Sequence, residues 1–187
     1  SSLFPFIEAG SSDLYVVPRF STAFLDPFAE IPTLSMLCSF FNKDGEPLAS
    51  APRYTLLKAL NAFEEVTGMQ FEAMGELEYY VIAPDEGLFP ATDQKGYHES
   101  APYAKFNEFR TECMAYIAQA GGQIKYGHSE VGNFTIDGRV YEQNEIEFLP
   151  VAAADAADQL VIAKWIIRNL AYRYGFDVTF APKITAG

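Results

Sequence analysis

In the segment Gly75-Glu76-Leu77-Glu78-Tyr79-Tyr80, charged residues alternate with apolar or aromatic ones from Glu76 to Tyr79. Successive side chains of a strand point to opposite faces, so Glu76 and Glu78 share one face and Leu77 and Tyr79 share the other. The apolar face is expected to pack against helices. Two carboxylates about 7 Å apart on one strand face can each serve one of two neighbouring cations. A solvent-facing pair of glutamates without a cation is the alternative interpretation.

A second acidic region flanks Asp137-Gly138, a dipeptide typical of a tight hairpin turn. It consists of His128-Ser129-Glu130-Val131 and Gln143-Asn144-Glu145-Ile146-Glu147. If these strands pair beside residues 70–83, four carboxylates converge: Glu76, Glu78, Glu130 and Glu145. Like charges at close range are unfavourable without a counterion, so convergence indicates bound Mg²⁺ or Mn²⁺. A glycosidase acid and base would need only two of these groups and leaves the others unexplained.

The rest of the chain alternates between helical and extended patterns and indicates an α+β fold. Apolar residues recur at helical spacing over residues 53–67, 102–120 and 154–174. Strand patterns cover residues 14–17, 34–41, 70–83, 123–136, 139–148 and 177–181. Turn-forming residues are frequent before Pro52 and the pattern changes there. We therefore expect a small β portion over residues 1–52 and a second domain over residues 53–187.

Composition limits the classes of partner. The 187 residues carry a formal net charge of −12, which disfavours binding to nucleic acid and to anionic membrane surfaces. Cys38 and Cys113 lie far apart among apolar neighbours, as buried reduced thiols do, and with only two histidines a zinc site of the usual type is not expected. No apolar run approaches the roughly 20 residues of a membrane span. A reducing cytoplasm is the expected location.

Motifs in a fixed order along almost the whole chain together resemble the glutamine synthetase family. They are Ser1-Ser2, residues 11–18, residues 21–28, Ala51-Pro52-Arg53, Gly75-Glu76-Leu77-Glu78-Tyr79-Tyr80, His128-Ser129-Glu130-Val131, Gln143-Asn144-Glu145, the helix with Asp155, Asp158 and Lys164, and Thr179-Phe180-Ala181-Pro182-Lys183. The resemblance implies a small N-terminal β-grasp-like portion and part of a glutamine synthetase catalytic domain. That domain would have a curved antiparallel sheet and packed helices.

The resemblance also implies a function, which is ATP-dependent ligation of ammonium to glutamate through γ-glutamyl phosphate, in nitrogen metabolism. It implies two divalent cations, Mg²⁺ or Mn²⁺, in each complete site. Glu78, Glu130 and Glu145 would hold one cation, and Glu76 would contribute to the other. Glu78 and Glu145 would meet substrate through the metal. Glutamate, ammonium and ATP are the implied partners, in a cytoplasmic homo-oligomer whose subunits share their sites.

The sequence departs from the family pattern in three places. Ser129 replaces a histidine, and the segment from Glu130 to Glu145 is longer than usual, with the Asp137-Gly138 hairpin expected to absorb the excess. The resemblance ends before the family's Met-His segment, which implies an incomplete, inactive fragment in which no catalytic residue is assigned. A ligase of glutamate with a polyamine-type amine and a non-catalytic regulatory homologue remain alternatives. Retention of the clustered carboxylates counts against the latter.

Overall fold

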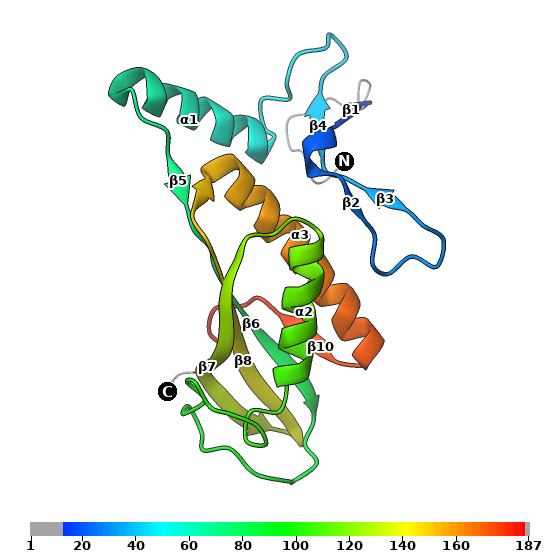
Figure 1. Ribbon diagram of the computed structural model, residues 1–187, viewed down its shortest axis with the longest axis vertical. Helices are drawn as coiled ribbons and strands as arrows, with labels where there is room; N and C mark the ends of the chain where they lie inside the picture. The colour runs from blue at the N-terminus through cyan, green and yellow to red at the C-terminus, as the bar shows by residue number, and fades with distance from the viewer. Residues whose placement is uncertain (1–12, 186–187) are drawn as a thin grey trace. The chain divides into compact units, whose positions relative to one another are not determined.

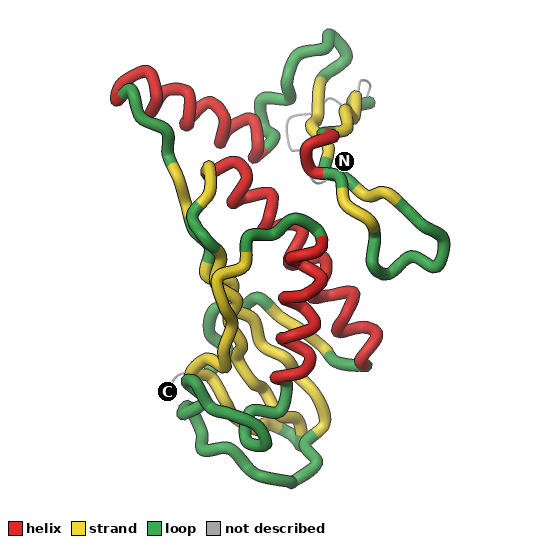
Figure 2. Tube along the Cα trace, viewed as in Figure 1, coloured by secondary structure: helices red, strands yellow, loops and turns green. Residues whose placement is uncertain are grey.

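The computed structural model describes residues 13–185, and it confirms an α+β fold (Figures 1 and 2). The Ser1-Ser2 motif lies outside the described residues. The chain forms two compact units. The N-terminal unit contains residues 13–73 and 151–158, and the sheet unit contains residues 74–150 and 159–185. Among the described helices, none has the length and apolar character needed to cross a membrane.

Short antiparallel pairs and one helix form the N-terminal unit. β1 (Tyr15–Pro18) pairs with β4 (Cys38–Phe41), β2 (Phe24–Leu25) with β3 (Leu34–Ser35), and β5 (Glu72–Ala73) with β9 (Val151–Ala152); a 3-10 turn, η2, covers Phe20–Thr22. The single strand predicted over residues 34–41 is therefore wrong. Both backbone groups of Leu37 are used elsewhere, since its N–H donates to Thr22 Oγ1 and its carbonyl accepts from Arg19 N–H. The chain consequently changes partner strand at this residue.

Helix α1 (Pro52–Thr67) confirms the helix predicted over residues 53–67. Proline at the first helical position loses no hydrogen bond, because the first N–H groups of a helix have no intrahelical acceptor. Gly68 ends the helix in the left-handed conformation, with φ of 69°, and its N–H donates to Glu64 O. Glycine adopts this conformation without the steric cost that a Cβ would add.

Asp158 ties three segments of the N-terminal unit together. Its carboxylate accepts two hydrogen bonds from Arg19, at 2.5 and 2.9 Å, and contacts Arg53 Nη1 at 2.8 Å. Arg53 Nη1 also contacts Ala154 O at 3.4 Å. The Asp158 side chain is 13% exposed, so the two guanidinium groups balance a largely desolvated charge.

The sheet unit contains a four-stranded antiparallel sheet in the order β10-β6-β8-β7. Its strands are β6 (Glu76–Pro84), β7 (Ile124–Ile136), β8 (Arg139–Phe148) and β10 (Asp177–Thr179). The predicted hairpin at Asp137-Gly138 is confirmed, because both residues have positive φ, 50° and 71°, and join β7 to β8. The strand predicted over residues 70–83 is interrupted at Gly75. A Cβ there would lie 2.9 Å from Leu160 Cδ2, so the close approach of the helix requires glycine.

Two helices supply the core on the apolar face of this sheet (Figure 1). Leu77, Tyr79 and Val81 are buried, while Glu76 and Glu78 are exposed, which is the alternation expected from the sequence. Tyr79 packs edge-on against Phe109 of α2 (Asn107–Gln119). The second helix is α3 (Ala153–Tyr174), whose sheet-unit residues buried in the core include Ile162, Ala163, Ile166, Ile167 and Leu170.

Helix α2 begins at Asn107, later than the predicted Pro102. The reason is the carboxylate of Glu142, a fully buried residue of β8. Its two oxygens accept from the backbone N–H groups of Lys105 (2.7 Å) and Phe106 (3.3 Å). An anion that binds free N–H groups stabilises a helix start, so a residue distant in sequence fixes where α2 begins.

Candidate metal centre

The sheet register brings the acidic residues of β6, β8 and β7 into neighbouring rows. Glu78 lies opposite Glu145, which lies opposite His128 on the far side of β8. In the next row Glu76 lies opposite Glu147, which lies opposite Tyr126. Directly opposed residues of adjacent strands point to the same face, so both rows project from the face that carries Glu76 and Glu78.

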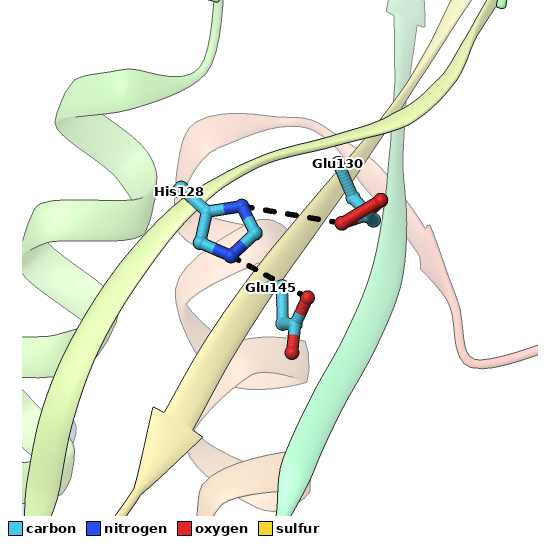
Figure 3. A group of neighbouring side chains, drawn as sticks. All are labelled: His128, Glu130 and Glu145. Carbon is cyan, nitrogen blue, oxygen red and sulfur yellow. Dashed lines mark ion pairs between the residues drawn. The ribbon is translucent and has the colours of Figure 1, made fainter. Parts of the chain in front are cut away.

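Three side chains of this face form a compact group of potential ligands. One donor atom from each of His128, Glu130 and Glu145 lies within 4.8 Å of the others. Figure 3 shows the two ring nitrogens facing the two carboxylates, with Nδ1 4.0 Å from Glu130 Oε2 and Nε2 3.5 Å from Glu145 Oε2. His128 stands in the motif His128-Ser129-Glu130-Val131, but the sequence pattern predicted no role for it. Its position two residues before Glu130 on one strand was the signal for it.

A second group joins the predicted Glu76 to Glu145 and Glu147, again with one donor atom of each within 4.8 Å. Glu147 is partnered, because it accepts from Lys125 Nζ at 2.7 Å and from the Tyr126 hydroxyl. Glu145 belongs to both groups and is the point where they meet.

The fourth predicted ligand, Glu78, lies opposite Glu145, but its carboxylate has a different partner. It accepts a hydrogen bond from Gln143 Nε2 at 2.6 Å. The Oε1 atom of Gln143 in turn accepts from Gly132 N–H at 3.0 Å. The buried Gln143 amide thus connects the Glu78 carboxylate on β6 to the part of β7 that follows Glu130.

The β7–β8 hairpin connects Glu130 to Glu145, and both carboxylates belong to one group. A bulge interrupts the pairing of β7 with β8 in this segment. Ser129 lies opposite Asn144 and Asn133 opposite Glu142, so residues 130–132 of β7 face Gln143 alone. The preceding loop supports the bulge through backbone N–H groups of Gln94, Gly96 and His98, which donate to Asn133, Val131 and Ser129.

Gly132 leaves no room for a side chain in this bulge, so we expect Gly132→Ala to destabilise the protein. An added Cβ would lie 2.2 Å from the Tyr80 hydroxyl and 2.7 Å from Gln143 Oε1. Overpacking of this kind costs about 1–3 kcal/mol, measured as the change in free energy of unfolding in urea. Tyr80→Phe in the same chain should recover only part of the loss, because Gln143 still obstructs the Cβ. Equal stability of Gly132→Ala and the parent would contradict the bulge geometry.

The environment of Glu145 is unfavourable for a charge. Burial raises the pKa of its carboxyl to about 7; His128 opposes this shift, and Glu130, Glu76 and Glu78 add to it. The Lys125 ammonium and the Tyr126 hydroxyl, both bonded to Glu147, lower the pKa of that carboxyl. Glu145 is therefore the acid of the cluster that is most in need of a positive partner. Its carboxylate and those beside it suit a divalent cation, and the donor set fits one.

This environment makes a prediction about pH. The pKa of the Glu145 carboxyl is about 7 in the folded chain and 4.5 in the unfolded chain. Its contribution to the stability of the fold is therefore full below pH 4.5 and is lost as the pH rises through about 7. In metal-free buffer, Glu145→Gln should match the parent in melting temperature at pH 4 and exceed it by roughly 2–4 °C at pH 8. Thermal unfolding followed by circular dichroism at both pH values measures the difference. An equal difference at the two pH values would contradict the assignment.

Behind the cluster, on the opposite face of the sheet, lies a buried polar network around Arg110. The guanidinium donates to Asn144 Oδ1, to Asn107 Oδ1 at 2.6 Å and to Ser129 Oγ at 3.3 Å. Ser129 and Asn144 immediately neighbour the ligand residues in sequence. Ser129 thus has a structural partner in Arg110, which no local sequence pattern indicated.

Comparisons with known proteins define the class. Residues 49–187 match the family model described as "Glutamine synthetase, catalytic domain", which places most of the chain in a catalytic domain. The chain belongs to the glutamine synthetase family. It is 27% identical over 185 residues to the glutamine synthetase of Methanococcus voltae, covering 98% of this chain and 40% of that protein. For the Thermus thermophilus enzyme the identity is 28% over 196 residues, with 100% and 42% covered.

A solved structure has the same fold. The chain matches a cryo-electron microscopy structure of Plasmodium falciparum glutamine synthetase with a TM-score of 0.81 and 21% identity. The match covers 99% of this chain and 41% of that one. The chain therefore spans about two-fifths of the length of the relatives that it matches.

Proposed function

We propose that this chain carries the cation-binding part of an enzyme that ligates ammonium to glutamate at the expense of ATP, through γ-glutamyl phosphate. The observation that carries the proposal is the convergence of His128, Glu130 and Glu145 within 4.8 Å, in a member of the glutamine synthetase family. Phosphoryl transfer depends on positioning and on neutralising charge, and clustered carboxylates that hold divalent cations suit that task.

In this proposal Glu78, Glu130 and Glu145 hold one Mg²⁺ or Mn²⁺ ion, and Glu76 contributes to a second. When bound, the ions would neutralise phosphate charge and orient glutamate. Glu78 and Glu145 would then meet substrate through the metal. Glu145 supports the assignment most strongly, because its side chain is 8% exposed and its charge is disfavoured without a cation.

We also propose a division of the chain into a β-grasp-like portion over residues 1–52 and a catalytic portion over residues 53–187. The family model begins close to this boundary, at residue 49. A cytoplasmic homo-oligomer with sites shared between subunits is proposed from family membership. Because its relatives are more than twice as long, we expect residues 1–187 alone to bind metal without turning over substrate.

The test is ADP release with Mg²⁺ and glutamate, with and without ammonium, and then with a panel of alkylamines and polyamines in place of ammonium. It is run on this chain and on any longer protein that contains it. Turnover that requires ammonium and is lost in Glu78→Gln is the expected result for the longer protein. Turnover with an organic amine but not with ammonium would indicate a glutamate–amine ligase. Its absence with every amine, despite metal binding, would favour a non-catalytic homologue.

A further inference from the structure

We propose that His128 ligates the cation of this site through Nε2, so that the site favours a transition-metal ion such as Mn²⁺ or Co²⁺ over Mg²⁺. The inference rests on the proposed function in one respect, which is that Glu130 and Glu145 bind a cation. It adds a nitrogen ligand to an all-carboxylate set and thereby changes the class of metal that the site prefers.

The first observation concerns which ring nitrogen is available. His128 Nδ1 lies 2.9 Å from the backbone carbonyl oxygen of Ser129. A carbonyl oxygen only accepts hydrogen bonds, so Nδ1 carries the proton and donates it. The lone pair of the neutral ring is then on Nε2. Histidines that ligate metals almost always donate their other ring N–H to a carbonyl or a carboxylate, which is the arrangement found here.

The second observation is the position of Nε2 relative to Glu145. His128 Nε2 lies 3.5 Å from Glu145 Oε2, a distance that suits two ligands of one ion. Two donor atoms that each lie about 2.1 Å from a metal are about 3.0 Å apart when the donor–metal–donor angle is roughly a right angle, and further apart when that angle is wider. Both side chains are 8% exposed. Among the described residues, His128 Nε2 is the one basic side-chain nitrogen within 4.0 Å of the Glu145 carboxylate. A glutamate whose side chain is more than nine-tenths buried thus points its carboxylate at the ring nitrogen that carries the lone pair.

The third observation is that the ring is held in place before any ligand arrives. The rings of His98 and Tyr126 stack on it, with centroids at 4.3 and 5.6 Å and interplanar angles of 21° and 28°. The backbone N–H of His98 donates to the same Ser129 carbonyl at 2.9 Å. His128 is 7% exposed, so rotation of the ring would disturb these contacts. A site held by packing in this way loses little entropy when it binds an ion.

The ligand set decides the metal class. Mg²⁺ takes oxygen ligands and is bound mostly by carboxylates, phosphates and water, whereas imidazole suits first-row transition metals. One imidazole with two carboxylates therefore favours Mn²⁺ or Co²⁺. We expect His128→Gln to weaken Mn²⁺ binding about tenfold or more and to change Mg²⁺ binding by less than about twofold.

The experiment records electron spin-echo modulation of Mn²⁺ bound to the full chain at substoichiometric metal. The chain contains two histidines, so His98→Gln leaves His128 as the sole imidazole. We expect ¹⁴N modulation in the parent and in His98→Gln, and its loss in His128→Gln. Growth on ¹⁵N-histidine should convert the parent signal to that of ¹⁵N, which keeps the test decisive even where His128→Gln does not fold.

The outcomes separate the two proposals. One outcome is that Mn²⁺ binds to the parent and not to Glu145→Gln, while the parent shows no modulation from a histidine nitrogen. This outcome would overturn the assignment of His128 and leave the carboxylate site intact. Nitrogen modulation that persists in His128→Gln and disappears in His98→Gln would overturn it as well. A chain that binds no Mn²⁺, or binds it equally well in Glu145→Gln, would contradict the proposed cation site itself and the nitrogen ligand with it.

Discussion

Asp158→Ala is expected to lower the free energy of unfolding of the chain by about 3 kcal/mol, because it leaves two arginines without their shared partner. Arg19 and Arg53 contact the Asp158 carboxylate at 2.5 and 2.8 Å, and their side chains are 16% and 26% exposed. Removing one partner of a desolvated pair costs more than the pair contributes, since the remaining charge stays desolvated. Urea unfolding followed by circular dichroism measures the change.

Asp155 provides a matched control on the same helix. It is an exposed acid in the first turn of α3, so its removal changes the net charge equally. Its replacement by alanine should cost less than about 1 kcal/mol, from the weaker interaction with the helix dipole. If the two alanine variants unfold at the same urea concentration, the buried cluster does not stabilise the N-terminal unit as described.

The affinity of the chain for Mn²⁺ is expected to depend strongly on Glu145. Glu145→Gln is expected to weaken Mn²⁺ binding by about 100-fold or more, because it removes a charged ligand shared by both acidic groups and keeps its shape. At saturating metal, a parent that binds Mn²⁺ gains about 2–3 kcal/mol from it, or several degrees in melting temperature. The variant should show almost none of this increase.

Glu86→Gln is the control for the metal experiment. Glu86 is exposed and lies outside both acidic groups, so the substitution removes one charge without touching the site. Its Mn²⁺ affinity should equal that of the parent. An equal loss of Mn²⁺ affinity in Glu145→Gln and Glu86→Gln would mean that binding depends on the overall charge of the chain and not on the cluster.

Local patterns predicted the sheet well. The alternation from Glu76 to Tyr79 and the Asp137-Gly138 turn act through neighbouring residues only, and the structure confirms both. These signals need no knowledge of distant contacts. They were sufficient to place Glu76, Glu78 and Glu145 on one face of paired strands.

The features that sequence reasoning missed all depend on residues far apart in the chain. The start of α2 is fixed by Glu142, a β8 residue that lies beyond the helix. The break at Gly75 follows from the approach of Leu160. The packing of the His128 ring depends on the ring of His98, which lies in the loop before α2. Such contacts exist only once the chain has folded, so no local pattern encodes them.

We propose that these carboxylates serve the phosphorylation of glutamate. The most direct measurement is capture of the acyl phosphate by hydroxylamine, read as γ-glutamyl hydroxamate, with ATP, glutamate and Mn²⁺. It is made with this chain and with any longer protein that contains it. We predict hydroxamate in the longer protein that depends on ATP and glutamate, and its loss in Glu145→Gln but not in Glu86→Gln. Hydroxamate formed at the parent rate by Glu145→Gln would contradict this role of the carboxylates.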